Sequence, residues 1–122
     1  MITQIITLNM IPDGTPQVIH INQNDTGTHR FEFYLTYNGN PFYQFSSSAV
    51  FKLRGTKPNG QTFETTCTAV EEMLSGKIYW ICDLTADMDD VAGDVYCNIE
   101  MIDGSDRTGT QAFILRVQQE AK

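Results

Sequence analysis

Short turn-forming pairs of residues recur along this chain and limit how long any regular element can be. Asn or Asp before Gly supplies the positive-φ positions that tight hairpins need. The clearest turns are Pro12-Asp13-Gly14, Asn38-Gly39, Pro58-Asn59-Gly60, Ser75-Gly76 and Asp103-Gly104. Turns at such short intervals favour many short strands over long helices.

Between these turns, apolar and polar residues alternate with a period of two. Phe31, Phe33 and Leu35 share one face, for example, and polar or charged neighbours stand opposite. One buried and one wetter face per strand predicts an all-β, immunoglobulin-like antiparallel β-sandwich of about seven to nine short strands. A small barrel is the alternative. We expect strands near residues 2–9, 17–22, 29–36, 41–45, 49–54, 61–68, 77–83, 94–102 and 110–118.

One short helical turn is expected near residues 85–91. Thr85 suits the N-cap position, and Asp87 suits the positive end of a helix dipole. The side chains expected to face the core from this turn are Leu84, Met88 and Val91. A capping-box pattern also begins at Thr68, but the end of a hairpin explains it equally well, so a helix there is the alternative.

The composition bounds the domain organisation and the classes of partner. At 122 residues and 41% hydrophobic, the chain can build a core without metals or disulfides. We expect one β-sandwich domain over residues 1–118 and a frayed end at 119–122. The 15 acidic residues against 8 basic ones argue against nucleic acid, since neutralising phosphates needs clustered Lys and Arg. The N-terminus lacks the features of a signal peptide, and no apolar run could span a bilayer, so we expect cytosolic synthesis and no membrane insertion.

Few residues suit catalysis or cofactor binding. Cys67, Cys82 and Cys97 each lie in an apolar or β-branched run and are expected to be buried, reduced thiols. His20 reads as a half-exposed strand residue and His29 as a loop or edge residue. Because no nucleophile elbow, phosphate-binding loop or zinc-binding helix pattern occurs, we expect no enzyme activity, no catalytic residue and no cofactor.

The strongest candidates for metal ligands are Asp87, Asp89 and Asp90, with Asp94 nearby. Calcium prefers several oxygen ligands around a loop, but Val91 stands where the calcium-loop pattern needs another ligand. Clustered Asp at a helix start also has a dipole explanation. We predict no metal site, and whether Asp87, Asp89 and Asp90 bind calcium stays open.

Residues 37–45 place four aromatic side chains around a turn. Some must be core, while others could present rigid surface to a protein or a sugar. Tyr37, Phe42 and Tyr43 are therefore the candidate interaction surface. A carbohydrate-binding or adhesion module would stack these rings on sugars. Exposed coplanar aromatics on one face would favour that function, and buried ones would argue against it.

The order of features along nearly the whole chain carries a further signal. Its parts are residues 5–9, 18–25, 31–35, 50–53, 76–80, 95–100 and 110–117, with Asn38-Gly39, Lys57-Pro58-Asn59-Gly60, Leu84-Thr85, Met88 and Gly93. In this order they resemble the N-terminal domain of the upper baseplate protein (BppU-like) family of siphophages and prophages of Gram-positive bacteria. Two departures stand out. Gln23-Asn24-Asp25 lacks the aromatic residue often found at its middle position. The chain also ends where relatives usually continue into a helical stalk, which fits a natural short form, a truncated form or a variant with a different role.

The resemblance implies a non-enzymatic structural domain of the phage or prophage tail. Such a domain would dock to the tail hub and help to position receptor-binding proteins during host attachment. Its partners would be other tail and baseplate proteins, with a homo-oligomer as an option, and its location would be the virion after synthesis in the host cytoplasm. A carbohydrate-binding module is the alternative from another class.

Overall fold

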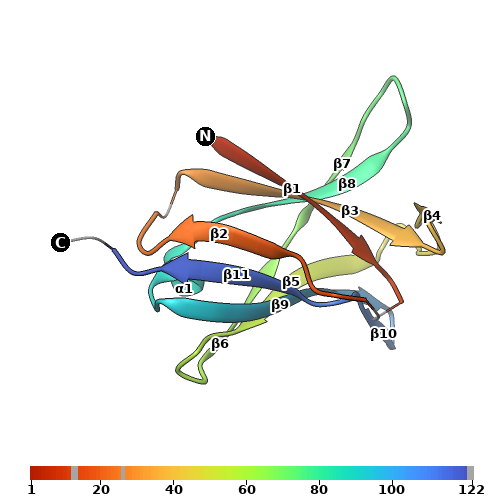
Figure 1. The fold of residues 1–122 in the computed structure, drawn as a ribbon. Helices are drawn as coiled ribbons and strands as arrows, with labels where there is room; N and C mark the ends of the chain where they lie inside the picture. The colour runs from red at the N-terminus through yellow and green to blue at the C-terminus, as the bar shows by residue number, and fades with distance from the viewer. Residues whose placement is uncertain (12–13, 26, 121–122) are drawn as a thin grey trace.

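The computed structural model describes residues 1–11, 14–25 and 27–120. Two mixed β-sheets pack face to face, which confirms the expected all-β sandwich (Figure 1). The elements are β1 (Ile2–Asn9), β2 (Val18–Asn22), β3 (His29–Tyr37), β4 (Asn40–Pro41), β5 (Val50–Thr56), β6 (Thr62–Thr66), β7 (Thr68–Glu71), β8 (Ile78–Asp83), α1 (Ala86–Asp89), β9 (Gly93–Asp103), β10 (Asp106–Gly109) and β11 (Phe113–Gln118).

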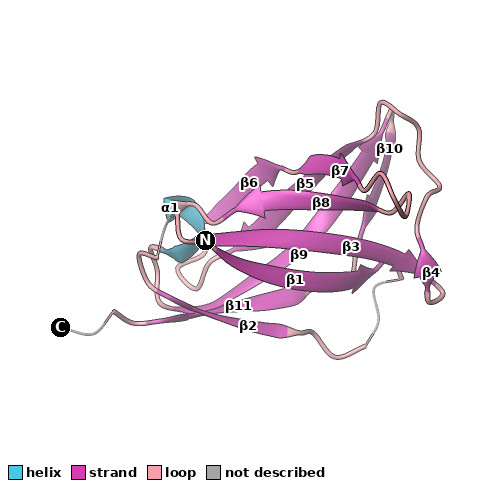
Figure 2. Cartoon of the chain, turned by 90° about the horizontal axis from the view of Figure 1, so that it is seen from above, coloured by secondary structure: helices cyan, strands magenta, loops and turns pink. Residues whose placement is uncertain are grey.

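The five-stranded sheet has the order β1-β3-β8-β7, and β4 pairs with β3. The six-stranded sheet has the order β2-β11-β9-β5-β6, and β10 pairs with β9. Figure 2 looks onto the five-stranded sheet and shows α1 at one end of the sandwich and β4 at the opposite end. The β3–β4 turn and the connection between β7 and β8 therefore lie away from α1.

The sheets are mixed rather than purely antiparallel. β1 pairs in parallel with β3, and β2 pairs in parallel with β11. β1 lies at the edge of the five-stranded sheet and β2 at the edge of the six-stranded sheet. Each of them runs in the same direction as the strand with which it pairs. Period-two alternation cannot reveal this, because it fixes the faces of a strand and not the direction of its neighbour.

Aromatic side chains join the two layers in the core. The Trp80 ring on β8 lies 4.3 Å from Phe51 on β5 and 5.6 Å from Phe45, measured between ring centroids. Phe33 on β3 lies 5.6 Å from Phe113 on β11 in the same way. Because these contacts cross between the sheets, burial of the rings holds the sandwich together.

Three predicted strands differ from the observed ones. The strand expected at 61–68 divides at Cys67, where β6 ends in the six-stranded sheet and β7 begins in the other, so the helix alternative at Thr68 is excluded. The strand expected at 41–45 shortens to β4, because Phe42 turns into the core. The strand expected at 110–118 begins at Phe113, and residues 106–109 form the unpredicted β10.

Several other expectations about local structure hold, although Thr85 occupies the predicted N-cap position without a capping hydrogen bond from its side chain. The helix α1 lies within the predicted turn at 85–91, with Leu84 and Met88 buried and Val91 half-buried. All three cysteines are buried and free, as predicted. The predicted turn residues Pro12 and Asp13 lie outside the described residues. No helix in the described part of the chain has the length and apolar character needed to span a membrane.

Candidate interaction surface

The three aromatic residues chosen from the sequence lie together at the β3–β4 turn. Asn38 and Gly39 both have positive φ (51° and 79°), which closes this turn tightly. Tyr37 and Tyr43 are 45% and 49% exposed, whereas Phe42 is 7% exposed. All three line one hollow of about 220 Å³. Phe42 therefore anchors the segment in the core, and the two tyrosines form its accessible part.

A second hollow extends this surface across the outer face of the five-stranded sheet. Its volume is about 200 Å³, and Tyr43 lines it together with Tyr34, Pro41, Lys77 and Ile78. The Tyr34 ring stacks on that of Tyr79, with centroids 5.3 Å apart and planes at 24°. Sequence reasoning missed this pair. The signal was the outward position of Tyr34 and Tyr79 in two strands that turn out to be neighbours.

The surface around Tyr34 is acidic as well as aromatic. Partial desolvation raises the pKa of the Tyr34 hydroxyl, and the carboxylates of Glu32 and Glu72 add to the effect. Tyr34 therefore remains a neutral hydroxyl that can donate a hydrogen bond to a partner. An aromatic surface with carboxylates beside it suits a partner that carries cationic groups.

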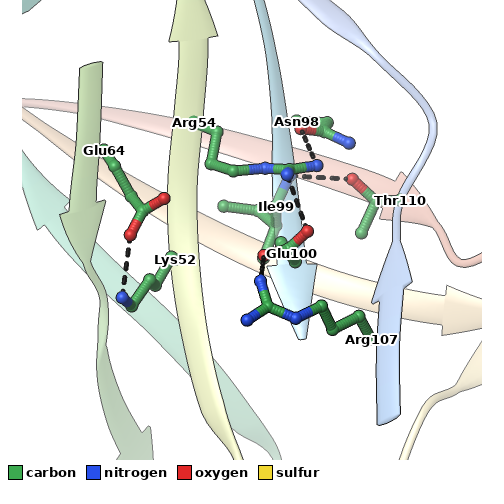
Figure 3. A network of polar contacts seen from close by, with 8 residues as sticks. All are labelled: Lys52, Arg54, Glu64, Asn98, Ile99, Glu100, Arg107 and Thr110. Carbon is green, nitrogen blue, oxygen red and sulfur yellow. Dashed lines mark hydrogen bonds and ion pairs between the residues drawn. The ribbon is translucent and has the colours of Figure 1, made fainter. Parts of the chain in front are cut away.

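The outer face of the six-stranded sheet has a different character. Glu100 is largely buried, and its carboxylate lies 2.6 Å from Arg54 Nη1 and 3.4 Å from Arg107 Nη1 (Figure 3). Beside it, Lys52 Nζ donates a hydrogen bond of 2.8 Å to Glu64 Oε1, which lowers the pKa of that carboxyl. The charged groups of this network are thus paired within the chain, although Arg54 and Arg107 share one carboxylate, and the pairs link β5 to β6, β9 and β10.

The two histidines differ in how well the sequence predicted their surroundings. His20 is exposed on β2, but His29 is the buried first residue of β3, which corrects its reading as a loop or edge residue. His29 Nε2 lies 3.5 Å from Asp25 Oδ2, and both histidines line a hollow of about 300 Å³. Its place on the inward face of β3, the face that also carries Phe31 and Phe33, explains the burial.

The acidic cluster around α1 does not converge on one point. Asp90 pairs with Lys57 at 3.0 Å, Asp89 is buried, and Asp87 is exposed. Across residues 1–11, 14–25 and 27–120, no group of three or more His, Cys, Asp or Glu side chains is arranged to hold a metal ion. Asp90 is instead an ion-pair partner for a buried lysine.

Comparison with known proteins shows a similarity of fold. No family model matches the sequence, and no curated protein matches it. Among solved structures, the fold is similar to the N-terminal domain of phage TP901-1 ORF48. The TM-score is 0.64 at 11% sequence identity, and the match covers 97% of this chain and 99% of that one. The predicted resemblance to a phage N-terminal domain is thereby confirmed at the level of the fold.

Proposed function

We propose that this chain is a non-enzymatic structural domain of a phage tail that docks to the tail hub and helps to position receptor-binding proteins. The observation that supports this most is the structural similarity over nearly the full length of both chains. Its expected location is the tail baseplate of the virion, with other tail proteins as partners. Self-association is an option that the same experiments can test.

The surface around Tyr37 and Tyr43 is the proposed docking face. Exposed tyrosines beside hollows supply large, rigid contact area at low entropic cost. A sugar would need several open ring faces side by side, but Phe42 is buried, Tyr34 and Tyr79 stack on each other, and only Tyr37 and Tyr43 of the candidate rings are exposed. The observed rings therefore favour a protein partner over the carbohydrate alternative.

Affinity capture from a lysate of a prophage-induced culture tests the proposal. The wild-type chain should retain tail hub proteins, and the double variant Tyr37→Ala/Tyr43→Ala should retain at least about tenfold less. The matched control is Tyr96→Ala, because Tyr96 is 58% exposed on the outer face of the other sheet. Retention of no tail component, together with binding to purified wall polysaccharide, would replace this proposal with the carbohydrate-binding function.

A further inference from the structure

The connection between β7 and β8 projects beyond the two layers of the sandwich (Figure 1). At its tip, Met73 is 98% exposed and Leu74 is 99% exposed. Scattered apolar residues are common on protein surfaces, but two adjacent large ones held fully in water on a projection are not explained by the fold. Neither side chain contributes to the core, so folding does not account for their apolar character.

Hydrogen bonds hold the backbone of this tip in a defined shape. The Glu72 N–H donates to the Lys77 carbonyl at 2.8 Å, and the Gly76 N–H donates to the Glu72 carbonyl at 2.8 Å. The Lys77 N–H also donates to Ser75 Oγ at 3.3 Å. Gly76 has a φ of 71°, which closes the turn without strain. A preformed loop loses less entropy when it is bound, so the tip is suited to insertion into a partner.

The charged residues next to the tip indicate which kind of partner could bind it. Glu71 and Glu72 are exposed directly before the tip and Lys77 directly after it, which leaves the hairpin end with a net negative charge, and Glu72 also acts on Tyr34 from this side of the sheet. Anionic lipid headgroups would be repelled by these carboxylates, which disfavours a membrane surface. A protein pocket with an apolar floor and a cationic rim would complement both features of the tip.

A second copy of this chain does not supply such a rim. Of the 8 basic residues, six are already paired with carboxylates within the chain: Arg30, Lys52, Arg54, Lys57, Arg107 and Arg116. Lys77 lies on the hairpin itself, and Lys122 lies outside the described residues. Within the described residues, Arg54 and Arg107 share the one carboxylate of Glu100, so the six paired basic groups of a second copy leave one unbalanced positive charge, which is fewer than a rim facing both Glu71 and Glu72 needs.

We infer that Met73 and Leu74 insert into an apolar pocket with a basic rim on a different protein. The hairpin is contiguous with the surface described above, since Lys77 and Ile78 at its base line the same hollow as Tyr43. This docking site does not depend on the proposed tail role. It would serve any assembly in which the chain has a protein partner of that chemistry.

Residue-specific cross-linking in the cells that produce the chain tests this inference. Photoreactive p-benzoylphenylalanine is placed at Leu74, and the control carries it at Ser105, which is exposed at the β9–β10 turn. The expected result is a cross-link from position 74 alone to another protein, at a segment that contains apolar residues together with Lys or Arg. No cross-link, equal cross-linking from both positions, or attachment to lipid or to a second copy would overturn it. If the protein that is cross-linked to position 74 is not a tail protein, the result supports the docking site at Met73 and Leu74 and contradicts the proposed tail function.

Binding to the purified acceptor protein then measures the effect. Burying one such side chain is worth about tenfold to hundredfold in affinity, so Met73→Ser/Leu74→Ser should weaken binding at least about 100-fold. Glu71→Gln/Glu72→Gln should weaken it less and should reduce its dependence on salt. Thermal unfolding of both variants should match wild type, since these side chains are exposed. Wild-type affinity of the serine variant would refute the insertion.

Discussion

Substituting Gly55 by Ala should overpack the core between β5 and β6. Gly55 is buried and lies directly opposite Phe63 in the register of the two strands. The Phe63 ring covers the glycine so closely that an added methyl group would overlap its Cε1 and Cζ atoms. The same methyl would lie 3.1 Å from Cys97 Sγ, well inside the optimum of about 3.5–4.0 Å for apolar atoms. The ring or the strand must therefore move.

The expected cost is that of an overpacked core, about 1–3 kcal/mol in the free energy of unfolding. For 122 residues, the unfolding entropy near the midpoint is about 0.26 kcal/mol per K. Gly55→Ala should then lower Tm by about 4–12 °C. Phe63→Leu alone should cost about 1–2 kcal/mol, because Phe63 is buried against the glycine.

A double-mutant cycle followed by urea and thermal unfolding separates overlap from other effects. The smaller leucine makes room for the methyl, so the double variant should be about 1–2 kcal/mol more stable than the sum of the single changes predicts. Gly60→Ala is the matched control, because its methyl would have no atom within 4 Å and would meet only the cost of a φ of 86°. That cost should not change with Phe63→Leu. Additivity of Gly55→Ala and Phe63→Leu within about 0.5 kcal/mol would refute the overlap.

Three further outcomes can be measured on the isolated chain. Glu100→Gln should lower the free energy of unfolding measured in urea by about 1–2 kcal/mol. The loss should be smaller than for a deeply buried pair because Arg54 is 38% exposed. An unchanged free energy of unfolding would contradict the stabilising role of the network. The Arg116 guanidinium lowers the pKa of Asp94, so this pair stabilises the fold above the unfolded pKa. Its contribution should fade as pH falls below about 4 through the lowered folded pKa, and Asp94→Asn should show a shallower loss of Tm with acid. Burial raises the pKa of Cys97 to about 12, so a thiol reagent at pH 8 should leave it unmodified until urea unfolds the chain.

Strand positions could be predicted because each strand's two faces meet different environments. The alternation of Phe31, Phe33 and Leu35 with polar residues follows directly from burial on one side. Which sheet a strand joins could not be predicted, because that choice depends on contacts far away in sequence. At Cys67 the alternation continues while the chain changes sheets: its N–H still donates to Phe51 of the six-stranded sheet, and β7 begins at the next residue. Period alone therefore merged two strands.

The candidate surface was predictable only where it is local. Tyr37 and Tyr43 are close because one tight turn brings them together, and the turn is visible in the sequence. Tyr34 and Tyr79 meet because β3 and β8 are neighbours in the sheet, which requires the whole topology. A local pattern also placed a turn at Ser75-Gly76, but it could not show that the residues before it project into solvent.

The two outer faces of the sandwich differ in how their charges are balanced, and this difference bears on where a partner binds. Over the six-stranded sheet, basic side chains such as Arg54 and Arg116 already have carboxylate partners. On the five-stranded side, Glu32, Glu71 and Glu72 form no ion pair with any described residue. A partner at the first face would meet basic groups that already have carboxylate partners, so it would gain little from new charge pairs there. A partner with cationic groups at the second face would gain new pairs while it covers apolar side chains, so assembly should use the five-stranded side.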